Sequence, residues 1–160
     1  GRLMDVQQDV TTSAAEDQFV TVTIGSQLFG IPVLSVRDVL VAQKTTPIPL
    51  APPEVAGALN LRGRIVTAID MRRSLDLPAR KEGGPGMYVV VEEFDELYSL
   101  MVDSVGEVMT LPVDALERSP GTLDPRWRDI SGGIFRLDGT LLVVLDVERL
   151  LDFMGRVETP

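Results

Sequence analysis

The sequence predicts a mainly β (all-β) protein with short helices, folded as two similar small β-barrels that arise from an internal duplication and pack side by side. Apolar residues make up 44% of the 160 residues and aromatic residues only 5%. The core therefore rests on Val, Leu and Ile, which favour strands. Short alternating apolar runs are separated by turn residues. Sequence blocks also occur twice, and barrel closure protects short strands from exposed sheet edges.

The duplication appears as two pairs of matching blocks. Residues 28–40, LFGIPVLSVRDVL, match residues 97–109, LYSLMVDSVGEVM, and residues 57–77 match residues 133–153. Because both pairs occur in the same order at nearly the same offset, the chain consists of two similar units of about 70 residues each. Positions that differ between the copies become candidates for function, since the shared positions serve the fold.

The first copy follows a polar tail over residues 1–16, which we expect to be disordered. Residues 18–33 alternate in polarity around a Gly-Ser-Gln turn and predict a β-hairpin. Val36, Val39 and Leu40 have helical spacing and predict a helical turn. Four prolines within residues 45–53 exclude a helix and favour an extended edge segment. The remaining elements are a turn or short helix (54–60), a tight hairpin tip (61–64), a buried strand (65–69) and a short helix capped by Asp70.

The second copy repeats this order after a Gly-rich linker over residues 81–86. Its predicted elements are strands over 88–91 and 97–102, a helical turn over 104–109, a looser stretch over 111–130, a hairpin tip at Asp138-Gly139, a strand over 141–145 and a helix capped by Asp146. The predicted domains are a first barrel subdomain over 17–80, a second over 87–154 and a C-terminal tail over 155–160. The sequence does not indicate which barrel the first strand joins.

Composition excludes several classes of chemistry. The chain has no Cys and no His, which removes thiolate and imidazole catalysis, disulfides and the usual zinc ligands. The net charge of −9 opposes nucleic-acid binding, and no apolar run is long enough to span a membrane. The acidic residues over 92–96 lack the EF-hand pattern and are expected to form a solvated turn. We expect a cytoplasmic protein that has no catalytic residues, metal or cofactor and is not an enzyme.

Asp70 and Asp146 occupy equivalent positions in the two copies, which raises the possibility of an aspartic-protease dyad. That chemistry needs Asp-Thr/Ser-Gly loops with the two carboxylates close together. Here each Asp precedes a short helical run instead, as in Asp70-Met71-Arg72. We therefore interpret both as structural N-caps, with a carboxylate-only hydrolase or metal-dependent enzyme as the disfavoured alternative.

The copy comparison draws attention to Arg62. It aligns with Asp138 while the turn glycines Gly63 and Gly139 are kept, so the turn does not need an arginine. An arginine on a rigid hairpin could make an oriented contact with a partner, although an ordinary surface arginine remains the alternative. Val39 is expected to pack in the core because Val108 mirrors it. Val36 and Asp38 are expected on a more open face.

These residues carry a family resemblance. Asn60-Leu61-Arg62-Gly63, a strand and then Ile69-Asp70-Met71-Arg72 resemble the CheW-like domain family of bacterial chemotaxis coupling proteins. The run VDSVGEV at residues 102–108 is the next most specific element. The resemblance covers residues 18–153 and implies two SH3-like five-stranded barrels around a shared hydrophobic core.

The resemblance also implies a function. Members of the family are non-enzymatic adaptors that couple the cytoplasmic tips of transmembrane chemoreceptors (methyl-accepting proteins) to the histidine kinase CheA in membrane-associated arrays. The implied partners are the receptor tip, the CheA regulatory domain and other CheW copies in rings, without membrane insertion. The implied receptor-binding residues are Val36, Asp38, Asn60, Arg62 and Gly63. Asp38 stands where Glu is more usual, so its reach is shorter. The alternative is a CheW-like regulatory domain from a chemotaxis kinase or a CheW–receiver fusion.

Overall fold

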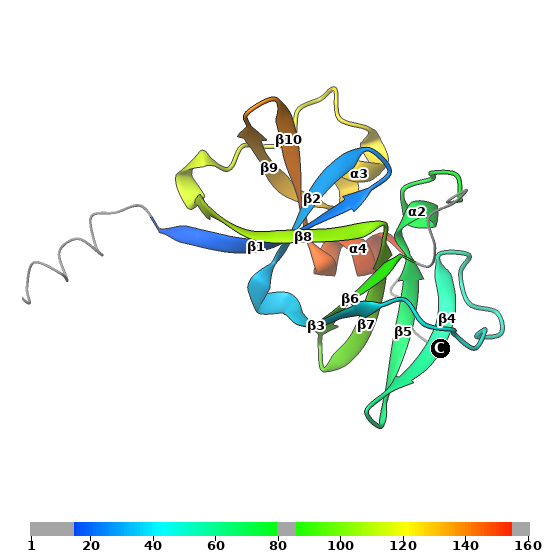
Figure 1. The fold of residues 1–160 in the computed structure, drawn as a ribbon. Helices are drawn as coiled ribbons and strands as arrows, with labels where there is room; N and C mark the ends of the chain where they lie inside the picture. The colour runs from blue at the N-terminus through cyan, green and yellow to red at the C-terminus, as the bar shows by residue number, and fades with distance from the viewer. Residues whose placement is uncertain (1–14, 80–85, 155–160) are drawn as a thin grey trace, which may run out of the picture.

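The computed structural model describes residues 15–79 and 86–154, which form two five-stranded sheets curled into adjacent barrels (Figure 1). The upper barrel of Figure 1 has the strand order β8 (Ser104–Pro112), β1 (Glu16–Ile24), β2 (Gln27–Pro32), β10 (Thr140–Leu145) and β9 (Ser131–Leu137). The lower barrel has the order β3 (Val36–Val41), β6 (Met87–Glu93), β7 (Glu96–Val102), β5 (Arg64–Asp70) and β4 (Val55–Leu61). The predicted fold class is confirmed.

Short helices connect the strands. They are the 3₁₀ turns η1 (Val33–Ser35) and η2 (Val113–Ala115) and the α-helices α2 (Met71–Ser74), α3 (Pro125–Ile130) and α4 (Val147–Phe153). The Asp70 carboxylate accepts hydrogen bonds from the backbone N–H groups of Arg72 (3.0 Å) and Arg73 (3.3 Å). Asp146 accepts one from Arg149 N at 3.1 Å. Both aspartates therefore cap the helices that the sequence assigned to them.

The two barrels exchange hairpins, so the predicted subdomains over 17–80 and 87–154 do not correspond to the sheets. The β1–β2 hairpin of the first copy joins β8, β9 and β10 of the second, and the β6–β7 hairpin of the second copy joins β3, β4 and β5 of the first. In each exchanged hairpin, the second strand pairs in parallel with a strand of the other copy. These pairs are β2 with β10 and β7 with β5. The first strand, β1, thus belongs to the upper barrel, together with β8, β9 and β10 of the second copy.

Each barrel is closed by a short bridge between the chain after one edge strand and the opposite edge strand. Thr46, beyond β3, exchanges two backbone hydrogen bonds of 2.8 Å with Ala58 of β4. Glu117, beyond β8, does the same with Ile134 of β9 at 2.8 and 2.9 Å. The preceding glycine has a positive φ at both bridges, 151° at Gly57 and 132° at Gly133. A Cβ would approach the Thr46 carbonyl to 2.5 Å or the Glu117 carbonyl to 2.7 Å. These glycines recur because closure needs them.

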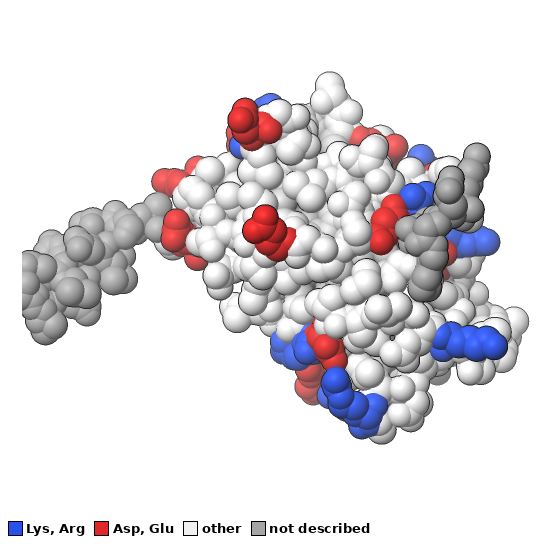
Figure 2. Space-filling view, in the orientation of Figure 1, with Lys and Arg blue, Asp and Glu red and all other residues white. Residues whose placement is uncertain are grey.

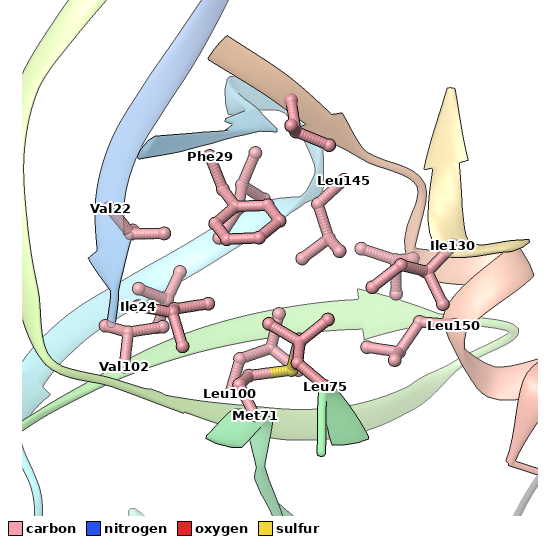
Figure 3. Packing of buried hydrophobic residues seen from close by; sticks show 14 of the residues in the cluster. Val22, Ile24, Phe29, Met71, Leu75, Leu100, Val102, Ile130, Leu145 and Leu150 are labelled. Carbon is pink, nitrogen blue, oxygen red and sulfur yellow. The ribbon is translucent and has the colours of Figure 1, made fainter. Parts of the chain in front are cut away.

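The largest core lies between the barrels (Figure 3). Figure 3 shows Ile24 and Phe29 of the upper barrel above Leu100 of the lower barrel, with Met71 of α2 beside Leu100 and Leu150 of α4 at the other side of the cluster near Ile130. All of these residues are buried, at no more than 1% exposure, and each such side chain contributes about 1.5–3 kcal/mol when it leaves water. Smaller clusters fill the individual barrels. The two barrels therefore share one core.

Three predicted local structures are wrong. Residues 36–40 and 104–109 lie in β3 and β8 rather than in helical turns, and residues 54–60 fall mostly in β4. Both β3 and β8 contain a register shift, between Val36 and Asp38 and opposite Val20–Val22. An extra residue in a strand interrupts its alternation, and here it gives the valines the spacing of a helical turn.

The predicted tails over residues 1–16 and 155–160 and the predicted linker over 81–86 lie outside the described residues, apart from three positions. Those positions are Ala15, Glu16 and Gly86. Glu16 is already the first residue of β1, so the ordered fold begins before the predicted boundary of the first barrel.

Candidate partner-binding site

The tip of the β4–β5 hairpin presents Arg62 in a fixed conformation. Arg62 and Gly63 have φ values of 51° and 86°, the two consecutive positive values of a type I′ turn. The Asn60 side-chain oxygen accepts a hydrogen bond from Gly63 N at 2.9 Å, which ties the turn to the strand before it. The predicted tight tip is confirmed, and the Arg62 side chain is 77% exposed.

Arg62 reaches from this tip to β3. Its Nη1 donates to Asp38 Oδ2 at 2.9 Å, while Asp38 Oδ1 accepts from Val39 N at 2.8 Å. An exposed ion pair of this kind contributes only about 0–1 kcal/mol to stability. A partner carboxylate could therefore replace Asp38 on the guanidinium at little cost, while the pair orients Arg62 beforehand.

Val36 and Val39 of β3 exchange the roles that the sequence predicted for them. Val36 is half-buried and packs against the core between the barrels, whereas Val39 is exposed at 37%. The expectation of a core position for Val39 is wrong. Beyond the register shift, alternate residues of β3 point to opposite faces, so Val39 faces outward while Leu40 leans toward the interior of the lower barrel.

Four of the five predicted site residues thus lie together: Asp38, Asn60, Arg62 and Gly63. Val36 lies on the same strand as Asp38 but is directed toward the core. Figure 2 shows basic and acidic side chains gathered at the lower end of the molecule, over β3 and the β4–β5 hairpin.

The sequence analysis missed two exposed apolar residues on the same strands. Ile65, expected in a buried strand, is 67% exposed directly after the hairpin tip, and Val41 is 57% exposed on the outward face of β3. Alternation over residues 65–68, with Val66 and Ala68 fully buried, places Ile65 outside. Arg37 was also missed. It donates to Glu92 Oε1 at 3.0 Å and to the Leu34 carbonyl at 2.8 Å, which fixes the start of β3.

The arrangement has the characteristics of a binding surface. The lower barrel carries an arginine oriented by Asp38 and, on the same two-barrel surface, the exposed apolar side chains of Val39, Val41 and Ile65, so it offers both an oriented charge and apolar contacts. Among residues 15–79 and 86–154, no three acidic side chains form a set of metal ligands. Within the same residues, no helix has the length and apolarity required to cross a membrane. The fold and this surface define a two-barrel protein-interaction module.

Comparison with known proteins identifies the family. The profile of the CheW-like domain matches residues 18–153, and the chain belongs to the CheW-like domain family. The chemotaxis protein CheW of Treponema pallidum is 28% identical over 137 residues, covering 83% of this chain and 81% of that protein. The chemotaxis protein CheW of Helicobacter pylori is 28% identical over 134 residues, covering 84% and 81%.

A solved structure shares the fold. The crystal structure of the scaffolding protein TtCheW from Thermoanaerobacter tengcongensis superposes with a TM-score of 0.79 at 24% identity. The match covers 90% of this chain and 98% of that one. The two-barrel architecture with its short helices is therefore the architecture of a known scaffold.

Proposed function

We propose that this chain is an adaptor of bacterial chemotaxis signalling that couples the cytoplasmic tips of chemoreceptors to the histidine kinase CheA. The match to the CheW-like domain family over residues 18–153 supports the adaptor role. The observation that carries the proposed site is the fixed hairpin tip, which holds Arg62 against Asp38 at 2.9 Å. The protein acts in the cytoplasm and is recruited to receptor arrays at the membrane.

The receptor tip is a helical structure, and a helix binds such a surface through apolar anchors with a charged rim. Val39, Val41 and Ile65 supply exposed apolar area on the lower barrel, and Arg62 supplies an exposed charge on the same barrel. On binding, Arg62 shifts from Asp38 to an acidic group of the receptor. The ends of the barrels then contact the CheA regulatory domain and neighbouring CheW copies in a ring.

Charge reversal at Arg62 tests this site. We expect Arg62→Glu to weaken binding of a receptor signalling fragment by at least about tenfold, a loss of roughly 1.4 kcal/mol. The melting temperature should change little, because the ion pair that is lost is exposed. Binding is measured by a pulldown and by titration calorimetry against purified receptor fragment and, separately, against the CheA regulatory domain.

Arg136→Glu is the matched control. Arg136 lies on β9 of the upper barrel, is 61% exposed and forms a comparable ion pair with Glu117 at 3.0 Å. Equal effects of the two charge reversals on receptor binding would show that overall charge, rather than the hairpin tip, governs affinity. Wild-type protein that binds neither partner would contradict the adaptor role itself.

A further inference from the structure

One junction between the barrels is filled by a half-buried ion pair between an arginine and an aspartate. Arg72, in α2, donates from Nε to Asp103 Oδ1 at 3.0 Å and from Nη2 to Asp103 Oδ2 at 2.8 Å. The same Asp103 oxygen accepts from Gly25 N at 2.7 Å, at the turn of the β1–β2 hairpin. A third arginine hydrogen bond goes to the Pro78 carbonyl at 2.7 Å. The hydrogen bonds to Asp103 raise the pKa of Arg72, so the guanidinium stays charged.

The equivalent junction in the other half of the molecule is open. Shifting between the copies places Glu148 at the position of Arg72 and Leu34 at that of Asp103. Leu34 is 89% exposed, and both residues line a pocket of about 630 Å³. The pocket lies between the start of β1, η1 and the start of α4. The duplicated fold thus has two equivalent junctions, and within the described residues side chains of the chain itself fill only one of them.

The open pocket has the charge and shape that complement an arginine. Five acidic residues line it, Glu16, Asp17, Glu93, Asp146 and Glu148, and none of its lining residues within the described ranges is Lys or Arg. Phe19, Val33, Val147 and Leu116 supply apolar walls. In Figure 2, acidic side chains flank the start of β1 at the left of the molecule. A planar guanidinium suits carboxylates on an apolar wall better than a strongly hydrated ammonium does.

A small metal ion fits less well. Across the described ranges 15–79 and 86–154, acidic side chains nowhere converge closely enough to hold a cation. A volume of about 630 Å³ is also far larger than a bare ion needs and falls in the range of ligand pockets. The dispersed carboxylates therefore favour a long cationic side chain together with a neighbouring apolar one.

We propose that this pocket is a docking site for an arginine that a partner protein presents beside an apolar residue. The arginine fills this junction as the Arg72–Asp103 pair fills the other one, and Glu148, which stands at the position of Arg72, is its main carboxylate. The site lies at η1 and α4 and is separate from the hairpin tip that carries Arg62. It is therefore a second interaction surface, and the proposal does not depend on the receptor-binding site.

Short blocked peptides test the pocket directly. The probe is acetyl-Leu-Arg-Leu-amide, compared with the same peptide containing citrulline, a neutral isostere, or lysine. In ¹H–¹⁵N NMR titrations, we expect the arginine peptide to shift the amide signals of Leu34, Val147 and Glu148. Its affinity should exceed that of the citrulline peptide by at least about tenfold. Equal binding of arginine and citrulline or lysine peptides, or no shifts up to about 10 mM peptide, would overturn the proposal.

Substitutions inside and outside the pocket test whether the peptide binds there. Glu148→Gln should weaken the arginine peptide several-fold, whereas Glu107→Gln, an exposed carboxylate on β8 that does not line the pocket, should leave affinity unchanged. The double variant Leu34→Asp/Glu148→Arg copies the Arg72–Asp103 pair into the pocket. It should keep a native-like spectrum and lose peptide binding. Wild-type affinity in the folded double variant, or the same shifts produced by Mg²⁺ or Ca²⁺ alone, would contradict the assignment.

Discussion

At the scale of single residues, what the sequence could reveal depended on the comparison between its two copies. Arg62 and Gly63 were singled out at the hairpin tip because the turn glycine recurs while the arginine does not, whereas Asn60 entered the site only through the family resemblance. The exposure of Val39 and the burial of Val36 were assigned the wrong way round, since both have a valine counterpart and sequence identity alone does not show which face a bulged strand presents. Ile65 was missed because a continuous apolar run resembles a fully buried strand.

Tyr88 gives the fold a measurable pH dependence. It is 1% exposed and donates to the Gln43 carbonyl at 2.8 Å, and burial raises its pKa above the ordinary value of 10.0. In the unfolded chain the phenol loses its proton near pH 10, whereas in the folded chain it keeps it to higher pH. The contribution of Tyr88 to the free energy of unfolding is therefore fully present below about pH 10, and it is lost as the pH rises through the pKa of the folded state.

We expect Tyr88→Phe to lower the free energy of unfolding by about 1 kcal/mol at pH 7, through loss of the hydrogen bond. The variant should also lose stability less steeply than wild type above about pH 10. Urea unfolding followed by circular dichroism at pH 7, 9 and 11 measures both effects. Parallel pH profiles for the two proteins would show that Tyr88 does not titrate differently on folding.

At the scale of elements, most strands and both predicted helix caps could be read from alternation, turn glycines and Asp positions. The bulged strands β3 and β8 could not, because the extra residue gives an apolar spacing that resembles a helix. The bridges at Thr46 and Glu117 that close the barrels could not be predicted from the local sequence pattern either, since each depends on a backbone contact with a distant strand. The recurrence of Gly57 and Gly133 was visible, but only the structure gives its reason.

Removing a helix cap should lower the stability of the protein without affecting partner binding. Asp70→Ala removes the acceptor for two backbone N–H groups of α2 and should destabilise the protein by about 0.5–2 kcal/mol. Asp138→Ala, at an exposed aspartate in the β9–β10 turn, is the control and should be nearly neutral. Urea unfolding gives the stability change, and receptor-fragment binding should be unaffected in both variants. Lost binding at full stability would assign Asp70 a direct role at an interface.

At the scale of the whole molecule, the duplication and the paired barrels were predictable, but the exchange of hairpins was not. The two hairpins resemble one another, so the apolar pattern allows each to pair with strands of either copy. The structure settles the pairing through the parallel contacts of β2 with β10 and of β7 with β5. Those contacts place most of the buried apolar residues between the barrels rather than within either one.

This exchange predicts that neither half folds alone. A fragment over residues 15–79 lacks the strands β6 and β7 of the lower barrel, and a fragment over 86–154 lacks β1 and β2 of the upper barrel. We expect each separate fragment to give a poorly dispersed NMR spectrum, and an equimolar mixture to recover native-like dispersion through the shared core. A fragment that is stably folded by itself would contradict the importance of the exchange.

The hairpin exchange also fixes the order in which the protein can form during synthesis. The strands of the lower barrel are all present once Val102 has emerged from the ribosome, but the upper barrel must wait for β10, which ends at Leu145. At about 5–20 residues per second, this leaves a delay of a few seconds. Throughout that interval, the β1–β2 hairpin, which is translated before the other strands, lacks the partners of apolar residues such as Phe19, which packs against Phe135 and Leu142 of the late strands. The earliest part of the chain is thus the last to be buried, and it is where nascent-chain chaperones would be needed most.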